Sequence, residues 1–154
     1  MLLPRISKVL VALDGSESAA KAADYALAIT KGLNAELIAI HAVRTEDVLY
    51  ETRNRLTDTE TVTTGDPILQ KVKEDAQRWF NTIKEKSSAN GIPLRTGLVI
   101  SPTEIDDTIV DYGDRENVDL IVIGGGKSEL KERLFGSTTS RVASQIKRPI
   151  LVVK

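Results

Sequence analysis

Cysteine is absent from the chain, and histidine occurs once, as His41. Disulfides are therefore excluded, and so is a zinc site built from several cysteine and histidine ligands. No apolar run approaches the roughly 20 residues of a membrane helix, and the residues before Ile6 contain no secretory h-region. We therefore expect a cytoplasmic protein with no membrane contact.

The chain also lacks an excess of charge of either sign. Lysine and arginine number 21 against 22 acidic residues, and the net charge is −1. Without an overall positive field, nucleic acid is not an expected partner. The length of 154 residues and the hydrophobic content of 41% are ordinary for one globular domain. We predict a single domain spanning residues 1–154.

What the chain does contain is a regular alternation of apolar segments with helical patterns. The expected strands are Ile6 to Leu13, Glu36 to Val43, Leu94 to Ile100, Asp119 to Ile123 and Pro149 to Val153. Strands with continuous apolar runs, separated by helices, indicate a parallel sheet covered on both faces. The sequence therefore predicts an α/β fold with a doubly wound five-stranded parallel sheet. We expect the strand order 3-2-1-4-5.

Local signals predict where the helices begin and end. Ser16 is a candidate N-cap and Gly32 a candidate stop for the first helix. The segment from Ser101 to Glu104 has the pattern of a capping box with proline at the first helical position. Residues 44–66 carry many threonines and charges, so we expect a long surface loop there.

Two loops have the composition of a ligand site. In doubly wound sheets, ligands bind at the carboxyl ends of the strands. Asp14-Gly15-Ser16 follows the first strand, and a glycine-rich loop from Gly124 to Ser137 follows the fourth. Glycines let backbone N–H groups approach phosphate, and the helix that starts near Ser137 would add a favourable dipole.

Two familiar nucleotide motifs fit this loop poorly. A Walker A motif ending at Gly126-Lys127-Ser128 would need glycine where Ile121 stands, in mid-strand. The dinucleotide fingerprint would need glycine in place of Glu129.

The spacing of Gly126, nine residues and Gly136-Ser137 resembles the nucleotide loop of the universal stress protein family, G-x2-G-x9-G-[S/T]. Further segments resemble that family in the same order, namely Val11 to Glu17, Ile40 to Val43, Asp119 to Gly124 and Arg148 to Val153. The first glycine spacer departs from the pattern, because one residue, Gly125, stands where the family has two.

The resemblance implies an ATP site, with Mg²⁺ as a possible companion near Asp14. It implies that Ala12 and Ala42 lie beside the adenine. The residues implied around the sugar and phosphates are Gly124, Gly126, Lys127, Gly136, Ser137 and Thr138.

Our first functional hypothesis is an ATP-binding regulatory module of the stress response that acts on an unknown protein partner. Hydrolysis would be slow at most, since no general base is evident and His41 is more simply explained as a structural residue.

The resemblance also implies a homodimer paired through the last strand, Ile150 to Val153. The alternative is a non-nucleotide homodimer of the same fold, because the shortened spacer affects the phosphate loop. Asp14 could likewise be only a turn former, and Ser137 only an N-cap.

Overall fold

The computed structural model describes residues 2–48, 67–126 and 136–154. Its strands are β1 (Lys8–Ala12), β2 (Glu36–Arg44), β3 (Leu94–Ser101), β4 (Leu120–Gly124) and β5 (Ile150–Val153). Its main helices are α1 (Glu17–Leu33), α3 (Pro67–Ala89), α4 (Ile105–Arg115) and α5 (Ser137–Gln145). All pairings are parallel and the order is β3-β2-β1-β4-β5, which confirms the predicted α/β class and topology.

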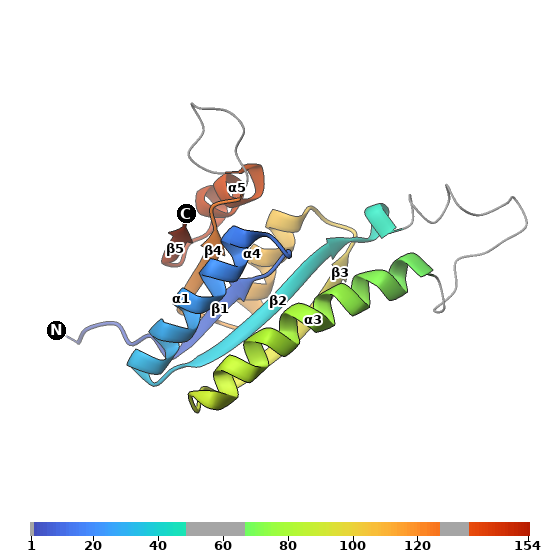
Figure 1. Ribbon diagram of the computed structural model, residues 1–154. Coiled ribbons are helices and arrows are strands. Elements are labelled where there is room, and N and C mark those ends of the chain that lie inside the picture. Colours follow the sequence, from blue (N-terminus) through green and yellow to red (C-terminus); the bar gives the residue numbers. More distant parts are fainter. Residues whose placement is uncertain (1, 49–66, 127–135) are drawn as a thin grey trace, which may run out of the picture.

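The sheet lies between two helical layers (Figure 1). Alternate residues of β1 enter different apolar clusters: Val9 and Val11 pack with α1 and α3, whereas Leu10 packs with α4 and α5. This alternation follows from the two-residue period of a strand. Because β1 and β4 are covered on both sides, they are apolar except for Lys8 at the start of β1.

Helix α1 buries residues that recur at a helical period in its sequence. Its buried residues are Ala19, Ala22, Ala23, Ala26, Leu27 and Thr30. Four alanines on this face allow close approach to the sheet, and the Thr30 hydroxyl donates to the carbonyl of Ala26 at 2.8 Å, so no buried polar atom of that side chain lacks a partner.

Three expected helix ends are corrected by the structure. Helix α1 continues through Gly32 and ends at Asn34, which has φ +54° and supplies the left-handed residue. The expected capping box does not form, because β3 continues to Ser101, which pairs with Arg44. The next helix instead starts after Glu104, without a side-chain cap. The N-cap of α5 is Gly136, so Ser137 does not fill that role.

Much of the expected surface loop, residues 49–66, lies outside the described residues. Arg44 belongs to β2, and residues 45–48 are helical. Over the parts of the chain that are described, no helix is both long and apolar enough to cross a bilayer.

Candidate functional site

The turn after β1 is held in place from both sides. The amide of Leu13 donates to the carbonyl of Ile40 at 2.8 Å, which ties the end of β1 to β2. Oδ1 of Asp14 accepts from the amide of Ser16 at 2.9 Å, so the turn-forming interpretation of Asp14 is correct. Ser16 Oγ then accepts from the amide of Ala19 at 3.1 Å and caps α1, as predicted. The Asp14 side chain remains exposed, so its turn role leaves it accessible to a ligand.

The two described ends of the glycine loop meet beside the start of α1. A Cβ at Gly124 would lie 2.7 Å from the backbone carbon of Ser18, so only glycine permits this approach of β4 to α1. The amide of Gly126, which has φ +74°, donates to Ser18 Oγ at 3.2 Å. The amide of Gly136 donates to the carbonyl of Gly125 at 2.8 Å. These contacts place the start of α5 against the end of β4.

Helix α5 presents a first turn without a side-chain cap. Its N-cap residue, Gly136, has no side chain to accept from the free N–H groups. Thr139 does not take that place, since its hydroxyl donates to the carbonyl of Gly124 at 2.8 Å. The helix dipole and the uncapped amides make this end of α5 suitable for an anion.

A cavity of about 270 Å³ opens between these elements at the carboxyl edge of the sheet. Of the nine residues expected at a nucleotide site, eight line it: Ala12, Asp14, Ala42, Gly124, Gly126, Gly136, Ser137 and Thr138. The ninth, Lys127, lies outside the described residues. The topology thus gathers residues from four separate segments, although their role as nucleotide ligands stays a prediction.

The cavity has a wall that the sequence analysis did not assign to the site. Ile105 and Ile109 of α4 line it, together with His41 of β2. Apolar residues at a helical period predict a core-facing stripe, and nothing in such a pattern distinguishes a residue facing a cavity from one facing another side chain. An apolar wall of this kind suits the face of a flat ring.

The electrostatics of the described lining are simple. Asp14 is its one charged residue. Burial lowers the pKa of His41. The hydrogen bond to Leu13 and the negative charges of Asp14 and Asp75 raise it, but their effect is smaller than that of burial. Nδ1 of His41 lies 2.6 Å from the Leu13 carbonyl oxygen, so a neutral ring donates there, and the structural interpretation of this histidine is correct.

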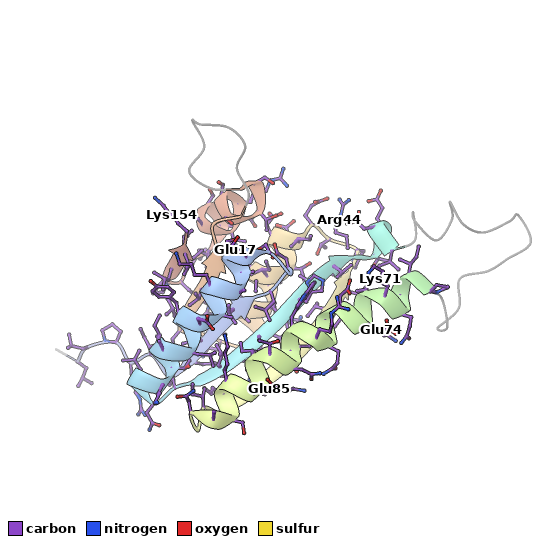
Figure 2. All side chains as sticks on the ribbon, viewed as in Figure 1. Glu17, Arg44, Lys71, Glu74, Glu85 and Lys154 are labelled. Carbon is purple, nitrogen blue, oxygen red and sulfur yellow. The ribbon has the colours of Figure 1, made fainter. Side chains whose placement is uncertain are left out.

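A nearby arginine is already paired with acids. Arg44, two residues beyond Ala42 at the end of β2, contacts Glu104 at 2.7 Å and Asp47 at 2.8 Å. Figure 2 shows Arg44 and Glu17 at the same end of the molecule, where β2 ends and α1 begins. Arg44 is thus engaged by two carboxylates next to the site.

The donor set for a metal ion is small. Within residues 2–48, 67–126 and 136–154, no group of three or more histidine or acidic side chains could hold an ion. Mg²⁺ usually keeps several waters and binds through one or two carboxylates plus substrate phosphates. Asp14 is compatible with this mode of coordination, because the hydrogen bond within its turn uses Oδ1 and leaves Oδ2 for a ligand.

Comparisons with known proteins show which family and which solved structures this chain resembles. The model of the universal stress protein family matches residues 5–154. Universal stress protein YxiE of Bacillus subtilis is 33% identical over 151 residues, covering 96% of this chain and 99% of that protein. The solved structure of MJ0577 of Methanocaldococcus jannaschii superposes with a TM-score of 0.73 at 27% identity, covering 98% and 97% of the two chains.

Two further solved structures contain nucleotides. A universal stress protein in complex with cAMP has a TM-score of 0.67 at 24% identity, with 98% of each chain covered. The universal stress protein of Archaeoglobus fulgidus in complex with dAMP has a TM-score of 0.64 at 20% identity, with 97% and 98% covered. At these identities the likeness establishes the shared fold.

Proposed function

This chain belongs to the universal stress protein family, and from that premise we propose that it is an ATP-binding regulatory module. The observation that carries the proposal is the single cavity joining the ends of β1, β2 and β4 to the uncapped first turn of α5. An apolar wall for a base and free amides for an anion are the two features a nucleotide needs. Adenine nucleotides in two solved relatives support the choice of ligand.

In this proposal each part of the cavity has a separate task. The base lies against Ile109 and beside Ala12 and Ala42. The phosphates face the start of α5, where Ser137 and Thr138 can donate hydroxyl and amide hydrogens. Mg²⁺, when bound with ATP, would offset phosphate charge near Asp14.

The proposed activity is binding, with a change of the surface offered to a partner protein. His41 uses Nδ1 to hold the Leu13 carbonyl, and Asp14 uses Oδ1 to hold its own turn. Neither group is arranged to activate a water molecule strongly, so we expect ATP hydrolysis to be slow at most. Steady-state phosphate release, with and without protein, measures it.

The test of the proposed function is ligand-linked stability. Mg-ATP at about 100 times its Kd should raise the free energy of unfolding by about 2.7 kcal/mol, because the ligand binds only the folded state. Thermal unfolding with ATP, ADP, AMP and cAMP would rank the nucleotides. No rise in melting temperature at millimolar concentration of any of them would overturn the proposal and favour a non-nucleotide interaction dimer.

Asp14→Asn tests the proposed Mg²⁺ role. Asparagine keeps an oxygen to accept from the amide of Ser16, so the turn is preserved while the charge is lost. We expect weaker binding of ATP in the presence of Mg²⁺ and little change without it. Asp111→Asn, at an exposed position of α4, is the matched control and should leave both affinities unchanged.

We also propose a homodimer formed through β5. This strand is at the edge of the sheet and pairs only with β4 among the described strands. Its first three residues are partly exposed aliphatic side chains, and an apolar edge invites pairing with a second copy. The measurement is sedimentation at micromolar concentration, and a monomer would contradict it.

A further inference from the structure

The side chain of Trp79, on α3, lies directly on the turn that carries Asp14. A Cβ built at Gly15 would be 2.3 Å from Cζ2 and 2.8 Å from Cε2 of Trp79. Contacts this short leave no room for any residue except glycine. Gly15 also has φ +81°, a conformation that glycine adopts at low cost. The indole therefore lies on the backbone of the turn at Gly15.

Trp79 has a second contact with the edge of the candidate site. Its ring centroid is 4.9 Å from that of His41, with the ring planes at 89°, a favourable edge-to-face arrangement. His41 lines the site cavity and is bonded to the carbonyl of Leu13. Trp79 thus contacts both the turn after β1 and the neighbouring residue of β2.

The turn separates the site from a second cavity. This cavity, of about 160 Å³, lies between α1 and α3, and Trp79 forms part of its lining. Leu13, Ser16 and Ala19 line both cavities. A movement of these shared residues towards either cavity would therefore change the surroundings of the Trp79 indole.

From these contacts we propose that Trp79 is a positioning residue that holds the Asp14–Ser16 turn in its binding geometry and couples occupancy of the site to α3. This inference rests on the proposed nucleotide function. The physical basis is preorganisation: a turn already ordered by the indole loses less conformational freedom when ligand binds. Without the indole, the turn loses more conformational entropy when the nucleotide binds, so the affinity for the nucleotide is weaker.

The chain contains one tryptophan, so tryptophan emission reports on the surroundings of Trp79 alone. Mg-ATP is titrated into the full chain while binding is followed by calorimetry and by tryptophan emission. We expect the emission to change with the same midpoint as the heat. A complete calorimetric isotherm with constant emission would overturn the coupling to α3 while leaving nucleotide binding intact. An absence of binding heat for the unaltered chain would overturn the proposed function, and this inference with it.

Variants of α3 separate positioning from general stability. Trp79→Ala should weaken Mg-ATP binding about fivefold or more, and Trp79→Phe, which keeps an aromatic ring on Gly15, should restore most of the affinity. Phe80→Leu is the control, because Phe80 is buried on the same helix and lines neither cavity. It should lower the melting temperature without changing the affinity.

Two results of these affinity measurements would contradict the positioning role of Trp79. Equal affinities of Trp79→Ala and the unaltered chain would overturn the positioning role. So would an equal loss of affinity in Phe80→Leu, because that loss would then reflect stability alone. If Trp79→Ala does not fold, Trp79→Leu takes its place, since leucine preserves apolar bulk but not the flat ring on Gly15.

Discussion

Gly15 and Gly32, before and near the end of α1, differ in what an added methyl group would meet. Gly15→Ala places a Cβ against the Trp79 ring at a positive φ, whereas a Cβ at Gly32 has nothing within 4 Å. We expect Gly15→Ala to lower the free energy of unfolding by about 2 kcal/mol or more. Gly32→Ala, inside a helix, should raise it by about 0.5–1 kcal/mol. Urea unfolding measures both, and equal effects would contradict the close Gly15–Trp79 contact.

His41 predicts a pH dependence of stability. Burial lowers its pKa in the folded state below the ordinary value of 6.5, so the unfolded chain binds more protons near that pH. The stabilisation is present above the unfolded value and is lost as the pH falls towards the folded one. We expect unfolding free energy to be lower at about pH 5.5 than near pH 7.5.

His41→Asn is the corresponding variant, because its amide can still donate to the Leu13 carbonyl but does not titrate. Its stability should change less between the two pH values than that of the unaltered chain. Identical pH profiles for the two proteins would show that carboxylates, rather than His41, produce the slope.

At the scale of an element, the N-terminus of α1 depends on one side chain. Ser16 Oγ accepts from the Ala19 amide at 3.1 Å, and Ser16→Ala removes that acceptor. We expect a loss of about 1 kcal/mol in unfolding free energy. Ser16→Asp should retain most of the stability, since aspartate is also a good cap. Ser144→Ala, on an exposed position of α5, should change it by less than about 0.5 kcal/mol and serves as the control.

The start of α4 shows why a local signal can fail. Ser101 has the sequence context of a cap, but its backbone pairs with Arg44 in the sheet. Its hydroxyl bonds instead to the amide of Thr103 at 3.3 Å. Eight residue pairs join β2 and β3, and extending that pairing outweighed a cap worth about 1 kcal/mol. A capping pattern carries no information about the length of the preceding strand.

At the scale of the whole molecule, the proposed dimer depends on the open edge of the sheet. The carbonyls of Pro149 and Val153 accept from the amides of Ile121 and Gly125, so the amide of Val152 points away from β4. Val152→Pro removes this outward donor while sparing the bonds to β4. In the proposed dimer it should shift sedimentation to the monomer, with the circular dichroism spectrum unchanged. A variant that remains dimeric would place the interface elsewhere.

The sequence by itself determined the order of elements along the chain and the buried face of α1. Both follow from the spacing of apolar residues along the chain, which indicates the type of element and the residues that it buries. It also indicated which loops reach the carboxyl edge, because parallel strands with right-handed crossovers bring their ends together. This is why eight of the nine expected residues line one cavity.

Only the tertiary structure decided what each buried group touches. The α4 wall of the cavity, the contact of Gly124 with α1 and the position of Trp79 over Gly15 all join segments far apart in the chain. A hydrophobic period specifies that a side chain leaves water, since burial of apolar area is non-directional. It does not specify the neighbour, which depends on how close-packed layers fit together in three dimensions.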